Sequence, residues 1–423
     1  MRSILSLAFG SCLLAAAGCV DIPYATAVAV EDSAGVRVVT TLSGAETVPA
    51  RPLTTEPVAE LGGGASPEVP LHRVSDVRPL GGGRMAVGTA SPPRALVFRE
   101  DGTLHATLGG EGDGPGEFRD VASVVALGGD SLAVWDQDRR RMSVFGPDGR
   151  YARDVDLGGL VPLSPRAAPG TSTPAGFTRL LHAGPGSLVA FVVGVWGFED
   201  AAPGAHRMEM PSHRIDADGR ELASYGPFPG YELYIHPDIG PSPYPFGADT
   251  YAAFSGDALV VGTAEAPEIR FYAPGGALAQ IVRWRGDDRT TDGSPLLAEF
   301  AEWRDEQISS REPREQEFFR QVFEGMPPPE TLPAYRGIVA DRESGEVWVG
   351  DYPGQLDLMS LTEEVRPVPA RRWLVFDSDG LLVATVRTPE RFDPYAVHEG
   401  RVWGVYRDTL DVESVRAYGV VKP

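Results

Sequence analysis

The chain has 423 residues, a formal net charge of −21 and 42% hydrophobic residues. This length and apolar content suffice for one large β domain or two ordinary domains. The strong negative charge argues against a nucleic-acid partner, because phosphate backbones are bound through basic surfaces. It suits a surface exposed to the medium of a cell envelope.

The amino end has the pattern of an export signal. Arg2 precedes an apolar run of small residues (4–17) that is too short to span a membrane. Three small residues stand directly before Cys19, and this order resembles the lipobox of bacterial lipoproteins. The resemblance implies a signal peptide over 1–18, a lipid on Cys19, a tether over 19–35 and an envelope location on the periplasmic or surface side. The alternative is ordinary signal cleavage and a released protein.

A repeating β pattern begins near residue 74. Each unit has an apolar strand, a glycine turn, a second strand ending in an aromatic or aliphatic residue, and an Asp-Gly or Gly-Gly turn, most clearly in residues 123–157. Such turns supply the positive φ angles of tight hairpins. A four-stranded unit cannot bury both of its faces alone, so we expect the units to stack into a β-propeller. We predict six units, starting near residues 74, 121, 177, 248, 335 and 393.

The last unit has three strands and lacks an outer fourth. A short β-rich run, Val36 to Leu42, stands alone before a Pro- and Gly-rich connection over residues 43–70. We expect this run to fill the open edge, because closure by an N-terminal strand removes an unpaired sheet edge. The predicted fold is thus an all-β, six-bladed propeller over residues 36–423.

One segment, about residues 287–333, interrupts the pattern between the fourth and fifth units. Ser294 is a predicted helix N-cap with Pro295 at the first helical position, and Gly325 ends the helical region. Two apolar stripes follow a helical period and must be buried: Leu296, Phe300 and Trp303, then Phe318, Phe319, Val322 and Phe323. We expect them to pack on the propeller's own face or rim; the alternative is a lid or docking surface.

By these features the chain resembles a known group. The segment GPGEF (114–118), with the strands that follow it, resembles an NHL-type propeller repeat. The whole chain resembles bacterial exported six-bladed β-propeller proteins through DSAGVRVV, LPAYRGIVADRESGEVWV and WLVFDSDG, at 32–39, 332–349 and 373–380. The resemblance implies this fold over most of the chain. It implies no common reaction and supplies no catalytic residues.

Several residues are candidates for a structural role or for a binding site. We expect the glycines before Phe118 to let the chain step between blades, with Phe118 filling the gap. Asp136 and Asp351 follow equivalent strands, and we predict that they accept backbone hydrogen bonds; the alternative is a ring of carboxylates around a divalent cation. His182 and His398 fall in first hairpins and are predicted as solvated turn residues that could otherwise reach a central channel.

Other chemistry is sparse. Cys12 and Cys19 are the two cysteines and both lie near the amino end, so we expect no disulfide and no cysteine metal site in the domain. No pair among the seven histidines has zinc-motif spacing. Aromatic residues gather in the third-to-fourth region and are predicted to cover the blade face, or alternatively to contact a sugar or peptide: Trp196, Tyr231, Tyr234, Tyr244, Phe246 and Tyr251.

Two functions remain open at this stage. The first is a monomeric, non-catalytic binding or scaffold module for an envelope protein, peptide or glycan, with no catalytic, cofactor or metal residue assigned. The second is a metal-dependent propeller enzyme, lactonase- or lyase-like, whose ligands would converge on the central channel from distant positions. Channel-lining residues decide between the two.

Overall fold

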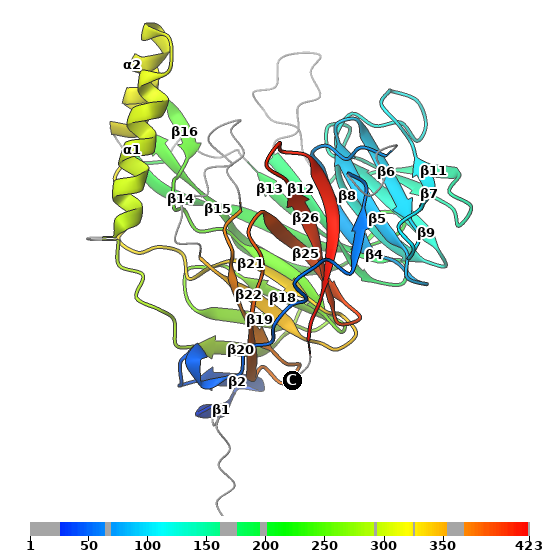
Figure 1. The fold of residues 1–423 in the computed structure, drawn as a ribbon, viewed down its shortest axis with the longest axis horizontal. Coiled ribbons are helices and arrows are strands. Elements are labelled where there is room, and N and C mark those ends of the chain that lie inside the picture. Colours follow the sequence, from blue (N-terminus) through cyan, green and yellow to red (C-terminus); the bar gives the residue numbers. More distant parts are fainter. Residues whose placement is uncertain are drawn as a thin grey trace, which may run out of the picture.

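The computed structural model describes residues 26–63, 69–160, 176–194, 201–291, 294–324, 326–352 and 368–421 (Figure 1). The predicted signal peptide, Cys19 and Trp196 lie outside these residues. The described chain is mostly β-strand and forms six separate sheets.

The first three sheets follow one another along the chain. The first contains β4 (Val74–Pro79), β5 (Met85–Ala90), β6 (Pro93–Phe98) and β7 (Leu104–Leu108). The second contains β8 (Val121–Gly128), β9 (Ser131–Asp136), β10 (Arg141–Phe145) and β11 (Tyr151–Asp156). The third contains β12 (Gly176–Gly184), β13 (Ser187–Gly194), β14 (Gly204–Asp216), β15 (Glu221–His236) and β16 (Gly240–Pro243).

The last three sheets include strands from the amino end. The fourth contains β17 (Tyr251–Ser255), β18 (Ala258–Gly262), β19 (Glu268–Tyr272) and β20 (Leu278–Trp284), followed by β2 (Val36–Thr41) and β1 (Val28–Ser33). The fifth contains β21 (Tyr335–Ala340), β22 (Val347–Asp351), β23 (Arg372–Phe376) and β24 (Leu382–Arg387). The sixth contains β25 (Phe392–His398), β26 (Arg401–Arg407), β27 (Glu413–Gly419) and β3 (Ala59–Leu61).

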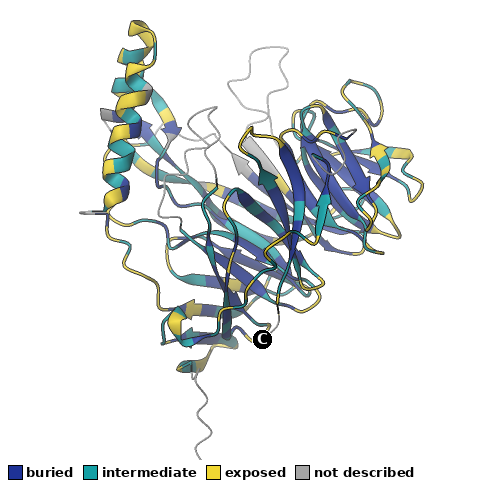
Figure 2. Cartoon of the chain, viewed as in Figure 1, coloured by how far each residue is buried: buried dark blue, intermediate teal, exposed yellow. Residues whose placement is uncertain are grey.

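The first strands of the sheets close a ring. β4 contacts β8, β8 contacts β12, β12 contacts β17, β17 contacts β21, β21 contacts β25, and β25 contacts β4 again. Each sheet therefore begins at a common centre and extends outward, its first four strands pairing antiparallel, and the fold is a β-propeller. Buried residues are concentrated in the sheets, and exposed ones lie in the turns and on the outward sides of the helices (Figure 2).

The faces of neighbouring sheets pack on each other through apolar side chains. Phe118 is fully buried between the first and second sheets, among Leu108, Val124 and Phe145. A Cβ on Gly109, which has φ +67°, would come within 2.2 Å of the Phe118 ring. Only glycine permits this approach, and the predicted role of Phe118 as the filler of this gap is confirmed.

The predicted partner of the first β run is wrong. β2 pairs in parallel with β20, with Val39 opposite Val282, and so extends the fourth sheet. The sixth sheet takes its outer strand from β3, which pairs antiparallel with β27. β3 lies inside residues 43–70, which were predicted to be irregular. An N-terminal strand does complete the sixth sheet, but its three residues are too few to give an alternating pattern.

Two helices lie between β20 and β21 in the described chain: α1 (Pro295–Ser309) and α2 (Pro313–Glu324). The Ser294 side chain accepts a hydrogen bond from the backbone N–H of Leu296, as an N-cap does. The buried side chains of the pair pack with Phe246, and Leu332 and Tyr352 border the same cluster. The predicted packing on the molecule's own surface is therefore confirmed for these side chains, but Phe318, which was predicted to be buried with them, is 50% exposed. The predicted helix end, Gly325, lies outside the described residues.

The helical pair projects from the body of the molecule (Figure 1). Neither of the helices in the described part of the chain has the length and apolar character needed to cross a bilayer.

Candidate functional site: a central cavity

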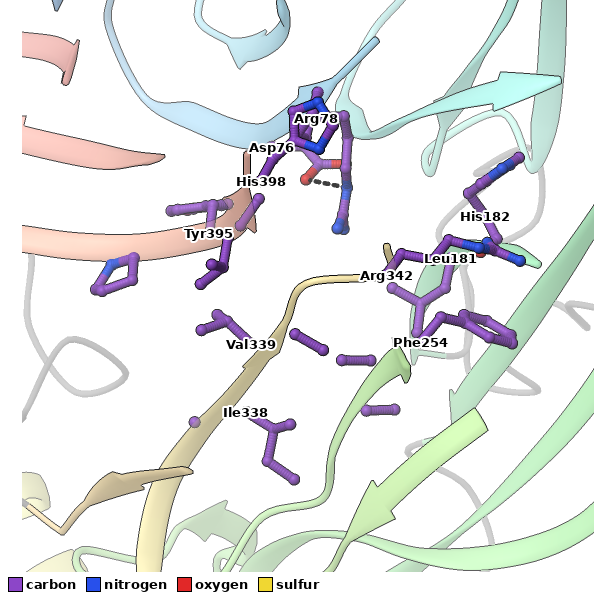
Figure 3. Close-up of a pocket in the computed structure, with 18 of the residues that line it drawn as sticks. Asp76, Arg78, Leu181, His182, Phe254, Ile338, Val339, Arg342, Tyr395 and His398 are labelled. Carbon is purple, nitrogen blue, oxygen red and sulfur yellow. Dashed lines mark hydrogen bonds and ion pairs between the residues drawn. The ribbon is translucent and has the colours of Figure 1, made fainter. Parts of the chain in front are cut away.

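A cavity of about 930 Å³ lies where the six first strands meet (Figure 3). Every one of these strands contributes to its wall. The polar and aromatic lining residues include Asp76 and Arg78 on β4, Ser123 on β8, Arg179 and His182 on β12, Tyr251 and Phe254 on β17, Arg336 on β21, and Tyr395 and His398 on β25. Their convergence follows from the repeat, because each unit places its first strand at the axis.

Asp76 joins two neighbouring sheets from within the cavity wall. Its buried carboxylate accepts hydrogen bonds from the backbone N–H groups of Val77 and Val124, each at 3.0 Å. It also forms an ion pair with Arg78 at 2.9 Å. Val124 belongs to β8, so the carboxylate ties β4 to β8, while the Arg78 side chain extends toward the open centre (Figure 3).

Arg342 ties together one end of the cavity. Its guanidinium donates to the carbonyl oxygen of His182 at 2.9 Å and lies 3.2 Å from the Asp257 carboxylate. It also lies 5.2 Å from the centre of the Phe254 ring. These partners come from β12, from β17 and from the turn after β17, while Arg342 follows β21. One side chain therefore connects the ends of three successive first strands. We call this the tied mouth.

His182 lies beside this tie, and its predicted place as a solvated turn residue is wrong. The half-buried imidazole lines the cavity, and its Nδ1 is buried without a hydrogen-bond partner among the described residues. Burial, with the charges of Arg342 and Arg78, lowers the pKa of His182 to about 4. The ring is therefore neutral near pH 7. His398, which was also predicted to be a solvated turn residue, likewise lines the cavity.

The other end of the cavity gathers cationic side chains around Tyr251, and we call it the open mouth. Tyr251 begins β17, and Arg179 and Arg336 stand near the starts of β12 and β21 on either side of it. Arg371 also lines the cavity there and donates to the carbonyl oxygen of Arg336 at 3.0 Å. Asp249, two residues before Tyr251, also lines the cavity.

Charged groups from several strands affect the pKa of Tyr251. Burial and the negative charge of Asp249 raise its pKa to about 12, and the charges of Arg336, Arg179 and Arg371 act in the opposite direction. Three guanidinium groups and one carboxylate therefore act on a single phenol. The hydroxyl therefore stays protonated near pH 7, and the ring packs 6.2 Å from that of Tyr335.

The two aspartates predicted as backbone acceptors have different partners. Asp136 is fully buried and accepts from the backbone N–H groups of Arg119, Asp120 and Arg139, at 3.0, 3.3 and 3.2 Å. This prediction is confirmed. Asp351 instead forms an ion pair with the Arg372 side chain. Neither lines the cavity, and the described residues contain no group of three or more His, Cys, Asp or Glu that could hold a metal ion.

The aromatic residues of the third-to-fourth region divide between packing and the site. Tyr244 donates its hydroxyl to the carbonyl oxygen of Pro327 at 2.8 Å, and Phe246 is buried against the helices. Their predicted covering role is confirmed. Tyr251 instead lines the cavity.

Sequence reasoning missed the arginines of the open mouth. Arg179 and Arg336 each begin the apolar stretch of their repeat unit, RLL and RGIV, at almost the place that Tyr251 holds in its own unit. Comparing the units position by position would have aligned these three residues. Arg371 has no such signal, because it precedes a third strand and reaches the cavity across its own sheet.

No protein-family model and no curated protein matches this sequence. Solved structures with similar strand arrangements include a Bacteroides vulgatus member of the DUF4221 family, with 12% identity, a TM-score of 0.48 and coverage of 88% of this chain and 98% of that one. A Bacteroides fragilis protein thought to be exported has 12% identity, a TM-score of 0.47 and coverage of 90% and 100%. A PQQ-bound aldose sugar dehydrogenase of Streptomyces coelicolor has 12% identity and a TM-score of 0.44, and the match covers 88% of this chain and 99% of that one. Likenesses this weak assign neither a family nor a function.

Proposed function

We propose that this protein is an exported six-bladed β-propeller, anchored to the cell envelope through Cys19, that binds a ligand in its central cavity without transforming it. In this proposal each sheet is one blade, α1 and α2 are an insertion between the fourth and fifth blades, and the chain acts as a monomer. The observation that carries the binding role is the cavity of about 930 Å³ with a wall built from all six first strands.

The size and construction of the cavity support binding. Ligand sites are typically concave, largely preformed and of about 300–1,000 Å³. The wall is held by contacts that do not need a ligand, such as the Asp76 carboxylate on the Val124 N–H and Arg342 on the His182 carbonyl oxygen. A preformed wall lowers the entropy lost on binding. We infer that the cavity recognises the terminal group of a peptide or of a glycan.

Side chains outside the cavity support a larger recognition surface. The helices, Phe246, Leu332 and Tyr352 form one cluster, and Tyr352 directly follows β22. These residues adjoin strand ends on the side where β17 and β21 begin, which is the side of the open mouth. A partner whose end enters the cavity would meet this surface next.

The binding role can be tested by filling the cavity. Ala126 lines the cavity, whereas Ala279 is exposed on β20, so Ala126→Trp and Ala279→Trp are matched variants. Defined glycan and peptide collections are screened against the full chain, and hits are mapped by hydrogen exchange. We expect hits to protect amides of β12, β17 and β21, to be lost in Ala126→Trp and to be kept in Ala279→Trp. Hits that protect outer strands only, or that survive Ala126→Trp, contradict the proposal.

The same screen tests the metal-enzyme alternative. Chemical conversion of a hit would replace binding with catalysis, and dependence of that conversion on a divalent cation would favour the metal-enzyme alternative. The anchor is tested separately: Cys19→Ala should move the protein from the membrane to the soluble fraction and abolish labelling by a fatty-acid analogue. Unchanged membrane retention contradicts the anchor and leaves the cavity proposal standing.

A further inference from the structure

A second, smaller pocket opens off the central cavity, and we call it the side slot. It has a volume of about 210 Å³ and lies between the first two sheets, beside the turns that follow β4 and β8 on the side of the tied mouth. Leu80, Gly81 and Ala126 line both the side slot and the central cavity, so the two spaces adjoin. A ligand held in the cavity can therefore place one of its groups in the side slot.

The wall of the side slot is mainly apolar. Its apolar side chains belong to the packed core between the first two sheets: Leu80, Val97, Ala106, Leu108, Ala126 and Leu132. An ion pair between Arg84 and Asp130 borders the slot and joins the β4–β5 turn to the β8–β9 turn. Because these two charges compensate each other, the slot selects for an apolar group.

The side slot exists because a small residue stands in β7. A Cβ on Gly149, in the β10–β11 turn, would lie 3.5 Å from the Cβ of Ala106. At the corresponding turn of the third sheet, a Cβ on Gly219 would lie 2.9 Å from a methyl carbon of Val155. Ala106 thus holds the place that Val155 fills between the next two sheets. Phe118 fills the other end of the same interface, whereas Ala106 leaves this end open.

The volume of the side slot suits one aromatic ring. Apolar cavities of about 150 Å³ bind benzene. The side slot is larger and continues into the central cavity, so a ring can enter it while the atoms attached to the ring stay in the cavity. A sugar ring carries hydroxyls around its edge, and burying them against an apolar wall without partners costs free energy. The phenyl side chain of a peptide has no such groups.

We propose that the side slot binds the aromatic side chain of a peptide whose terminal group lies in the central cavity. This inference rests on the proposed ligand-binding function and chooses a peptide over a glycan as the ligand. The cavity holds the polar end of the peptide, and the slot supplies the selectivity. Burial of a phenyl group strengthens binding by about tenfold or more, because it removes a large apolar surface from water.

Two matched pairs of neutral probes test the slot. The peptide pair is N-acetyl-phenylalanine amide and N-acetyl-alanine amide, and the glycan pair is phenyl glucoside and methyl glucoside. Each probe is titrated into the full chain by calorimetry. We expect the phenylalanine peptide to bind about tenfold or more tightly than the alanine peptide, and more tightly than phenyl glucoside. Tighter binding of phenyl glucoside than of the phenylalanine peptide contradicts the choice of a peptide.

Ala106→Val is the slot variant. Its matched control is Thr107→Val, because Thr107 is exposed on the same strand. Val155 shows that valine packs at this place, so Ala106→Val should fold, as circular dichroism and the melting temperature can confirm. The added methyl groups crowd the slot, so the phenylalanine peptide should bind about tenfold more weakly, while the alanine peptide binds as before. Thr107→Val should bind both peptides as the wild type does.

The outcomes separate the two proposals. Equal affinity of the wild type for the two peptides, or a phenylalanine preference that survives Ala106→Val, overturns the side slot. No saturable binding of the phenylalanine peptide at millimolar concentration overturns it as well. If a probe binds and protects β12, β17 and β21 from exchange without regard to its ring, the side slot is wrong while the cavity remains a binding site.

Discussion

The two mouths of the central cavity use arginine in different ways. At the tied mouth, Arg342 donates to the His182 carbonyl oxygen and pairs with Asp257, so its charge is employed in holding strands together. At the open mouth, Arg179 is exposed and lines the cavity together with Arg336, Arg371 and Tyr251. Arg342 thus holds strands together at one end, whereas Arg179 presents an exposed side chain at the other.

This difference gives a criterion for separating stability from function. A side chain that satisfies buried backbone groups should lower the free energy of unfolding when it is removed. A side chain that contributes charge to an open surface should leave stability nearly unchanged and alter only binding.

Asp76→Ala should cause the largest loss in the free energy of unfolding. It leaves the Val77 and Val124 N–H groups without their acceptor and Arg78 without its ion-pair partner. Leaving a buried donor without an acceptor costs about 1–3 kcal/mol, and two N–H groups lose theirs, so we expect the free energy of unfolding to fall by about 3 kcal/mol. Urea unfolding measures it, and Asp76→Asn, which keeps an acceptor oxygen, should lose less. Equal stability of Asp76→Ala and wild type would show that the β4–β8 contact does not depend on this carboxylate.

Arg342→Gln should cause the next largest loss in the free energy of unfolding. The His182 carbonyl oxygen loses its donor, and the contact with the Phe254 ring is lost as well. We expect a decrease of about 1–2 kcal/mol in the free energy of unfolding. Faster hydrogen exchange at the ends of β12 and β21, with β4 unchanged, is the local signature. If exchange changes uniformly across the molecule, Arg342 is not a clamp of this mouth.

The comparison also shows where sequence reasoning is strong. Turn chemistry and strand patterning located the units, and Ser294 located the start of α1. The pairing of β2 with β20 was missed because a β-rich run fits any open edge equally well, and pattern alone does not choose among edges. β3 was missed because three residues cannot show a period of two.

The site was harder to predict than the fold for a physical reason. Arg179, Tyr251 and Arg336 come from three different units and meet because the ring closes. Their chemistry has no local motif, unlike a metal-binding spacing. His182 was misplaced because a polar residue before a glycine turn is usually solvated, and only the ring places it inside.

Lowering the pH should destabilise the folded protein through His182, which lies at the tied mouth. Its pKa is lowered from 6.5 to about 4 in the folded protein, so the unfolded chain takes up a proton first as the pH falls. This contribution to stability is complete above pH 6.5 and is lost progressively toward pH 4. Because the ring is half-buried, we expect about 1 kcal/mol. His182→Gln should show a smaller fall in melting temperature between pH 7 and pH 4; an identical fall would remove His182 as its source.

Arg179→Gln should have the smallest effect on stability, and this is the sharpest contrast with Arg342→Gln. Arg179 is exposed at the edge of the cavity. Because substitutions of exposed side chains change stability little, the loss should stay within about 0.5 kcal/mol. Urea unfolding of both variants side by side measures the difference. A loss as large as that of Arg342→Gln would show that Arg179 also holds the ring together and would remove the contrast between the two mouths.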